Sequence, residues 1–280
     1  MNSIPLVRWP ALAVVALAGC AKGEKAPETA QPVAVTPPTV HVTATDYSFQ
    51  APDSLPAGLT SFHLMNSGKE LHHLVLVRLA EGQSVADFQK SDFSGPIPST
   101  VVLIGGPNPA TPEGTAEATV NLKPGKYAMF CVVPAMDGKP HIMKGMIREL
   151  TVTSSETVVT EPVADVTIKL TDYSFEISPA LTAGRHTIRV EDTGPQVHEL
   201  VWFKLEPGKT VEQMMRWTEK MEGPPPGTML GGVSPISMGE VNYLTLDLTP
   251  GEYGLICFVA DAKDKKPHFM HGMMKQITVI

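Results

Sequence analysis

The stretch FCVVPAMDGKPHIMKGM, residues 130–146, contains one of only three cysteines in the chain. Residues 256–273 read ICFVADAKDKKPHFMHGM and repeat the same order of cysteine, Pro-His and Gly-Met. One arrangement of thiol, imidazole and thioether groups therefore occurs twice. Such self-similarity indicates two copies of one structural unit.

The duplication extends over most of the chain. The motif TDYSF stands at residues 45–49 and again at 171–175, an offset of 126. The same offset relates Gly68 to Gly194, His72 to His198, Gly105-Gly106 to Gly231-Gly232, Pro124-Gly125 to Pro250-Gly251, Tyr127 to Tyr253, and Cys131 to Cys257. We therefore predict one domain at 39–153, a linker at 154–163 and a second domain at 164–280. Both have an ordinary domain size.

Each unit has the pattern of an all-β domain with one helix. Apolar residues alternate with polar ones in 40–45, 60–66 and 116–122, as in half-buried strands, while 73–79 is apolar on both faces like a central strand. Short strands separated by Gly and Pro favour a β-sandwich. Thr210 and Gln213 form a capping box before a helix, and Ser84 begins a weaker one. Met214, Met215 and Met221 are expected to fill the core beneath the second helix.

Four positions in each unit carry metal-binding chemistry. They are His72, Cys131, His141 and Met146 in the first unit, and His198, Cys257, His268 and Met273 in the second. Two imidazoles and a thiolate with a weak thioether are the ligands of a blue-copper site. Zinc prefers four firm ligands, and methionine is not usually among them.

These motifs resemble the cupredoxin family. The resemblance is carried by NSGKELHHL and DTGPQVHEL, by KPGKYAMFC and TPGEYGLIC, and by HIMKGM and HFMHGM. It implies two tandem cupredoxin-like Greek-key β-sandwich domains, each with a short inserted helix and one mononuclear copper. A single copper per chain is the second choice. The loop from cysteine to histidine is longer than in simple electron carriers of the family and similar in length to that of copper nitrite reductases.

The remaining histidines are expected to be non-ligands. His73 adjoins His72 and so points to the opposite face of a strand. We therefore expect it at the surface or behind a ligand, and His271 in an exposed loop. His41, His63 and His186 have no counterpart in the other unit and are expected to be structural.

Two alternatives to metal binding remain open. Cys131 and Cys257 could form a disulfide in an oxidising compartment, provided that the two domains bring them together. The cysteines could also be small buried apolar residues of a metal-free sandwich.

A copper site suggests three functions. The first is one-electron transfer, with the exposed edges of His141 and His268 as the exit. The second is copper handling, because Met136, Met143, Met270 and Met274 stand beside the candidate ligands and thioethers favour Cu(I). The third, an enzyme such as a nitrite reductase or multicopper oxidase, is not expected, because the histidines for a further copper cluster are absent and no small-molecule substrate is identified.

The N-terminus indicates a membrane anchor. Residues 1–19 have the pattern of a signal peptide, and the ending LAGC resembles the lipobox of bacterial lipoproteins. Cys20 would then be lipidated, and residues 20–38 would form a disordered tether. An ordinary secretory signal is the alternative. A lipidated Cys20 would place the protein in the bacterial cell envelope, facing the periplasm or exterior. Its expected partners are redox proteins of the envelope. A net charge of −7 argues against nucleic acid.

Overall fold

The computed structural model describes residues 36–90, 101–157, 159–218, 220 and 222–280. Over these residues the chain is mostly β-strand, which confirms the predicted class. The first repeat contributes β1 (Thr39–Thr45), β2 (Ser48–Gln50), β3 (Ser54–Pro56), β4 (Gly58–Asn66), β5 (Val75–Arg78), β6 (Val102–Gly105), β7 (Thr115–Leu122), β8 (Gly125–Phe130) and β9 (Ile147–Thr153). The second contributes β10 (Val166–Thr171), β11 (Ser174–Ser178), β12 (Gly184–Asp192), β13 (His198–Leu205), β14 (Gly227–Ile236), β15 (Val241–Leu248), β16 (Gly251–Ile256) and β17 (Met274–Val279).

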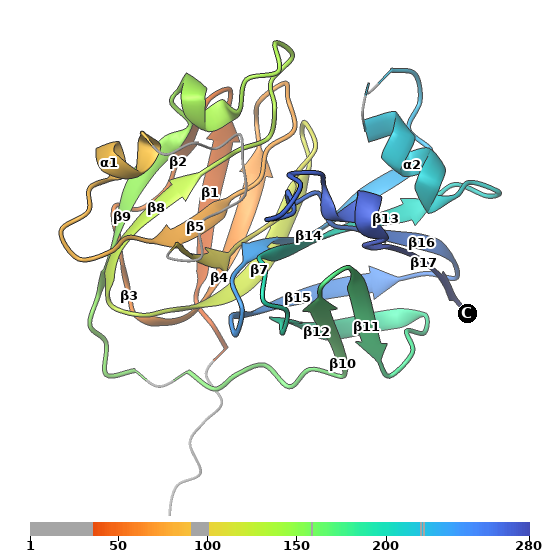
Figure 1. Ribbon diagram of the computed structural model, residues 1–280. Helices are drawn as coiled ribbons and strands as arrows, with labels where there is room; N and C mark the ends of the chain where they lie inside the picture. Colours follow the sequence, from red (N-terminus) through yellow and green to blue (C-terminus); the bar gives the residue numbers. More distant parts are fainter. Residues whose placement is uncertain (1–35, 91–100, 158, 219, 221) are drawn as a thin grey trace, which may run out of the picture. The chain divides into compact units, whose positions relative to one another are not determined.

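The strands form two sheets, and each sheet runs through both repeats (Figure 1). One sheet has the order β11-β10-β12-β15-β7-β4-β1-β2, and the other β17-β16-β13-β14-β6-β5-β8-β9-β3. The repeats meet where Tyr243 of β15 pairs with Thr119 of β7, and where Ile236 of β14 pairs with Ile104 of β6. We call this line of contact the seam. The sequence gives no sign of it, because the pairing uses backbone groups that almost every residue carries.

Each repeat buries an apolar core of its own between the sheets. The alternation predicted for residues 40–44 and 116–120 is observed, because Val42, Ala44, Ala118 and Val120 are all buried. The largest side chains of the second core include Trp202, which is fully buried. Burying one large apolar side chain contributes about 1.5–3 kcal/mol, so the alternation largely determines which face of each strand turns inward.

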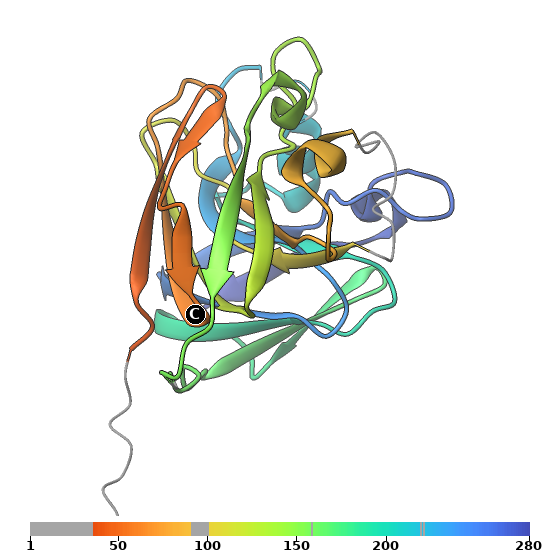
Figure 2. The same cartoon turned by 90° about the vertical axis from the view of Figure 1, so that its left-hand side faces the viewer.

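A short helix in each repeat covers the opposite face of the nine-stranded sheet. Helix α1 (Val85–Gln89) starts at Ser84 with a capping box and places Phe88 among Val75 and Val77. Figures 1 and 2 show α1, in gold, beside the green strand β9. The structure confirms both predicted helices.

The second helix also has the predicted cap. Helix α2 (Val211–Thr218) follows Thr210, whose side chain accepts a hydrogen bond from Gln213 N–H while the Gln213 side chain accepts from Thr210 N–H. Met214 beneath it is buried and Met215 packs against the same cluster, as predicted. Met221 lies outside the described residues.

The repeated Pro-Gly-x-Tyr motif closes a turn before the strand that leads to each cysteine. The hydroxyl of Tyr127 donates to Lys123 O at 2.8 Å and accepts from Lys123 N–H at 3.0 Å, and Tyr253 does the same with Thr249. Tyr127 and Met129 are fully buried, as predicted for inward residues below Cys131. The tyrosines therefore fix where β8 and β16 begin.

No helix among the described residues is both long and apolar enough to span a membrane. The predicted signal peptide, Cys20 and most of the tether lie outside the described residues. The domain limits at 39–153 and 164–280 remain predictions, since the two repeats share both sheets.

Candidate metal centres

The first candidate centre gathers three of the four predicted ligands of the first repeat. His72 lies between β4 and β5, where two backbone hydrogen bonds with Ala110 hold it. Cys131 directly follows β8, and His141 begins the 3-10 helix η1 (His141–Lys144). Ligand atoms of His72, Cys131 and His141 lie within 4.8 Å of one another, and all three residues are fully buried.

The distances between these atoms fit one shared ion. Nδ1 of His72 lies 3.1 Å from Nδ1 of His141, and Sγ of Cys131 lies 3.5 Å from the same His141 nitrogen. Two donors that are each about 2 Å from one ion lie roughly 3 to 4 Å apart when they subtend about 100–120°. Two imidazoles and one soft sulfur suit copper. The donors of the predicted copper cofactor are thus assembled in the first repeat.

The outer nitrogens of the same rings contact carboxylates. Nε2 of His72 lies 2.9 Å from Oδ1 of Asp46, and Nε2 of His141 lies 2.7 Å from Oε2 of Glu70. A neutral imidazole that donates through Nε2 keeps its lone pair on Nδ1. With both rings in this tautomer the two lone pairs face each other in a dry site, an arrangement that is favourable only with a proton or a metal cation between them. The carboxylates therefore prepare both rings as ligands.

Local backbone structure accommodates the long loop between Cys131 and His141. Ala135 N–H donates to Lys139 O at 2.9 Å and closes the middle of the loop. The turn after η1 passes through Gly145 at φ 101°, a conformation that favours glycine. Met146 N–H then donates to His141 O at 3.0 Å, and Cys131 N–H donates to Met146 O at 3.2 Å. Loop length therefore does not separate the ligand positions.

Met146 is placed beside the cysteine by these backbone bonds. It is fully buried and belongs to the same apolar cluster as Cys131. Met273 has the matching backbone bond to Cys257, at 3.1 Å. The role of both thioethers as axial ligands remains a prediction.

Burial controls the protonation of the first centre. Burial raises the pKa of the Cys131 thiol to about 12. Burial also lowers the pKa of His141, against the opposing effect of Glu70, so the imidazole is neutral near pH 7. A metal ion at this centre would replace the thiol proton, since thiolate is the ligating form.

The expected exposed edges of His141 and His268 are not observed. Both side chains are fully buried. The ring of Tyr47 lies 4.8 Å from that of His141, and the ring of Tyr173 lies 5.4 Å from that of His268. The prediction was wrong because the tyrosines, which are far away in sequence, cover the imidazoles.

The TDYSF motif thereby has a role that sequence analysis missed. Its aspartate, Asp46, contacts His72, and its tyrosine covers the second histidine of the centre. Burial raises the pKa of Asp46, but hydrogen bonds from Lys69 N–H and His72 outweigh that and lower the pKa. The occurrence of the motif in both repeats could have marked these residues as part of the site. Glu70 could not be found in this way, because glutamine replaces it at position 196 of the second repeat.

The second candidate centre has the same backbone frame but a different side-chain arrangement. Sγ of Cys257 lies 3.5 Å from Nδ1 of His268, as in the first centre. His198, however, directs Nδ1 toward Oδ1 of Asp192 at 3.0 Å, away from His268. Its Nε2 lies 3.1 Å from Asp172 without a hydrogen bond. His198 must rotate before Nδ1 can face the cysteine.

Two substitutions between the repeats account for this difference. Aspartate replaces Asn66 at position 192, and its buried carboxylate attracts the N–H of His198. Glutamine replaces Glu70 at position 196, and Nε2 of His268 has no hydrogen-bond partner. Burial and the neighbouring His198 lower the pKa of His268 to about 4. The first centre is therefore preorganised, and the second is not.

The remaining sequence predictions have mixed outcomes. Cys131 and Cys257 are both free thiols, so the alternative of a disulfide is not observed. His73 is buried, and its Nε2 accepts a hydrogen bond from Val132 N–H at 2.9 Å, directly beside Cys131. His271 is exposed, as predicted.

Three of the methionines considered for copper handling are exposed. The exposed fraction is 96% for Met136, 66% for Met143 and 60% for Met270. Met143 and Met270 lie within the 3-10 helices η1 and η2 (His268–His271), each two residues after a candidate ligand. Met274 is half-buried and packs under α2.

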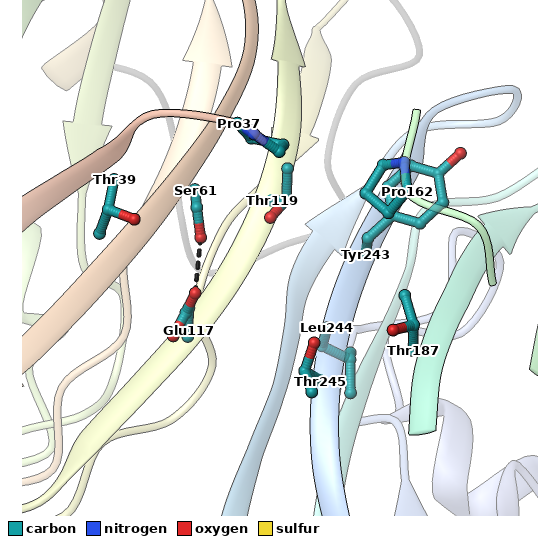
Figure 3. Close-up of a pocket in the computed structure, with 10 residues that line it drawn as sticks. All are labelled: Pro37, Thr39, Ser61, Glu117, Thr119, Pro162, Thr187, Tyr243, Leu244 and Thr245. Atoms are coloured by element: carbon teal, nitrogen blue, oxygen red, sulfur yellow. Dashed lines mark hydrogen bonds between the residues drawn. The ribbon is translucent and has the colours of Figure 1, made fainter. Parts of the chain in front are cut away.

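A small pocket of about 190 Å³ lies at the seam on the eight-stranded sheet (Figure 3). Figure 3 shows Ser61 and Glu117 joined by a hydrogen bond on one side, with Tyr243 and Thr187 on the other. None of the candidate ligands lines it. It belongs to the contact between the repeats.

No family model and no curated protein sequence matches the chain. Among solved structures, auracyanin A, a blue copper protein from Chloroflexus aurantiacus, is similar over 42% of this chain and 100% of its own, with 21% identity and a TM-score of 0.32. A copper nitrite reductase from Nitrosomonas europaea covers 88% of this chain and 94% of its own, with 14% identity and a TM-score of 0.25. A multicopper oxidase covers 86% and 88%, with 13% identity and a TM-score of 0.27.

These similarities correct one expectation. We expected a carrier and not an enzyme. The similar structures include enzymes, the nitrite reductase and the multicopper oxidase, beside the auracyanins. The expectation that excluded an enzyme therefore does not stand.

Proposed function

We propose that this protein is a membrane-anchored copper protein that passes single electrons through a type 1 copper site in each of two tandem cupredoxin-like Greek-key sandwiches. The observation that carries the proposal is the buried pair of Nδ1 atoms of His72 and His141, 3.1 Å apart and close to Cys131. The same three positions recur in the second repeat.

Copper would supply a one-electron couple at such a centre. The chain itself supplies the positions and orientations of the ligand side chains. Asp46 and Glu70 orient the two rings through Nε2, and the sheet fixes His72 and Cys131. A rigid site that changes little between oxidation states favours electron transfer, and full burial keeps water out. Met146 and Met273 are the proposed axial thioethers.

The anchor and the location are part of the same proposal. The signal-like residues 1–19 and Cys20 support a lipid anchor, and the Pro-rich segment up to residue 38 supports a tether. A redox protein at the surface of a bacterial envelope would exchange electrons with other envelope proteins. We propose such proteins as its partners.

Copper loading tests the ligand assignment. The parent protein is a Cys20→Ser chain, which removes the lipidation site and the one thiol outside the repeats. We expect two copper ions per chain in excess copper, with intense thiolate-to-copper absorption. Cys131→Ser and Cys257→Ser should each remove one ion and its share of the colour. Full copper content and colour in both variants would disprove the assignment.

Copper handling is a second candidate function. It is favoured by the exposure of Met136, Met143 and Met270 beside the loops that carry His141 and His268. Exposed thioethers bind Cu(I) and could pass it to the buried donors.

The two functions differ in a measurable way. A handler should lose Cu(I) quickly to a chelator, and changing the three exposed methionines to leucine should slow that loss. A carrier should retain its copper through repeated one-electron cycles, with the same rate of loss in the triple leucine variant. Met129→Leu, in the buried core, is the control for a methionine change as such.

A further inference from the structure

A buried chain of hydrogen bonds connects the two candidate centres across the seam. His73 and Glu199 occupy equivalent positions in the two repeats, each directly after the first histidine ligand. Nδ1 of His73 lies 3.3 Å from Oδ1 of Asn108, and Nδ2 of Asn108 donates to Oε2 of Glu199 at 2.8 Å. Asn108 therefore joins one repeat to the other.

The two ends of this chain lie beside the two cysteines. The backbone N–H of Glu199 contacts Sγ of Cys257 at 3.5 Å, and His73 is bonded to Val132, the residue directly after Cys131. Three residues thus lead from the backbone beside Cys131 to the sulfur of Cys257.

The side chains of His73 and Glu199 each contact the loop after a cysteine. Nε2 of His73 accepts from Val132 N–H at 2.9 Å, and Oε1 of Glu199 accepts from Phe258 N–H at 2.9 Å. Val132 and Phe258 each follow a cysteine directly.

The bridge consists of three buried polar side chains. His73, Asn108 and Glu199 have exposed fractions of 5%, 3% and 6%. Burying a carboxyl, an amide and an imidazole costs free energy unless every group is paired. Complementary groups stand at equivalent positions, histidine in one repeat and glutamate in the other, so a single amide can satisfy both. Apolar side chains would fill this space at less cost.

We propose that His73, Asn108 and Glu199 form a bridge that carries electrons between the two copper centres of one chain. The step is one-electron exchange: the reduced copper of one centre loses one electron, and the oxidised copper of the other gains it. No bond to the bridge forms or breaks, and no proton moves. This inference rests on the proposed function.

The test compares two changes at the seam. Asn108→Ser shortens the bridging side chain and introduces the residue that the second repeat has at the equivalent position, Ser234. Ser234→Ala is the matched control, because Ser234 Oγ donates to Pro107 O at 3.1 Å at the same seam without contacting the bridge.

Electron exchange is followed after a flash-generated reductant supplies about one electron per chain. The absorption bands of the two centres are first assigned from Cys131→Ser and Cys257→Ser. Electron transfer within a chain changes the relative absorbance of the two bands. Its rate does not depend on protein concentration. We expect Asn108→Ser to slow this phase at least about tenfold, with copper content, absorption and both reduction potentials unchanged. Ser234→Ala should leave the rate as in the parent.

Every other outcome overturns the inference. An unchanged rate in Asn108→Ser excludes the bridge as the path, and equal slowing in Ser234→Ala assigns the effect to the packing of the seam. A parent chain that binds one copper rules out exchange between centres and leaves the proposed function of the first centre intact. A parent chain that binds none removes both proposals.

Discussion

Asn66 and Asp192 occupy equivalent positions at the ends of β4 and β12, but only Asp192 contacts the first histidine of its repeat. Its Oδ1 lies 3.0 Å from Nδ1 of His198. The amide of Asn66 instead donates to Glu70 O and Ala110 O, at 2.8 and 2.9 Å, and leaves His72 free to face His141. The exchange of an amide for a carboxylate thus gives the first histidine of each repeat a different partner.

Asp192→Asn should strengthen copper binding at the second centre. The substitution removes the charge that holds the N–H of His198, so the ring can turn its Nδ1 toward Cys257. In a Cys131→Ser background we expect the affinity to rise about tenfold, measured by competition with a copper chelator. Asp247→Asn is the control, because Asp247 is exposed and pairs with Arg185 on the surface. Equal affinities before and after Asp192→Asn would contradict this account of the second centre.

Glu70→Gln should weaken copper binding at the first centre. Gln is the residue of the second repeat at this position, and the change leaves Nε2 of His141 without its charged acceptor. Loss of such a partner costs roughly 10–100-fold in metal affinity. Chelator competition in a Cys257→Ser background measures it. Glu117→Gln, which removes a surface carboxylate bonded to Ser61, should have no effect. Unaltered binding in Glu70→Gln would show that Glu70 does not orient the ring.

Gly68→Ala and Gly194→Ala should each disturb one centre alone. A Cβ at position 68 would lie 2.3 Å from Oδ1 of Asp46 and 2.7 Å from Nε2 of His72. A Cβ at position 194 would lie 2.6 Å from Cε1 of His198. We expect each variant to lose the copper of its own repeat and to keep the other, as counted by metal analysis. Each variant is the other's control, and loss of both ions from either one would indicate general misfolding.

His186 and Asp165 should make stability depend on pH near neutrality. Their hydrogen bond raises the pKa of His186. Burial raises the pKa of Asp165, but the hydrogen bonds from His186 and from Thr187 N–H outweigh it and lower that pKa. The contribution of His186 is complete below its unfolded pKa of about 6.5 and is lost as pH rises through the higher folded pKa. The contribution of Asp165 is lost only as pH falls through its lowered pKa.

Urea denaturation of the metal-free protein measures this dependence. The urea concentration at the unfolding midpoint should be lower in His186→Gln than in the parent. This difference should be larger at about pH 6 than at about pH 8. His63→Gln is the control, since His63 is half-exposed and lies 3.7 Å from Glu117. A difference that is equal at the two pH values would show that protonated His186 does not stabilise the fold.

The sequence by itself determined the repeat, the strands and the candidate ligands. Alternating apolar residues such as Val40, Val42 and Ala44 specify a buried face, because a strand has a period of two. The offset of 126 residues aligned His72 with His198 and Cys131 with Cys257 without coordinates. Chemistry that depends on residue type and order is readable in this way.

The tertiary structure alone decided how the ligands are covered, connected and oriented. The seam arises from backbone pairing between β6 and β14 and between β7 and β15, which no side-chain pattern encodes. Tyr47 and Tyr173 bury imidazoles that lie about 95 residues further along the chain, within the same repeat. The contrast between Asn66 and Asp192 becomes meaningful only when a distance shows that one carboxylate holds His198 away from its cysteine. Contacts between residues distant in sequence depend on how the sheets pack, and a single sequence does not contain that information.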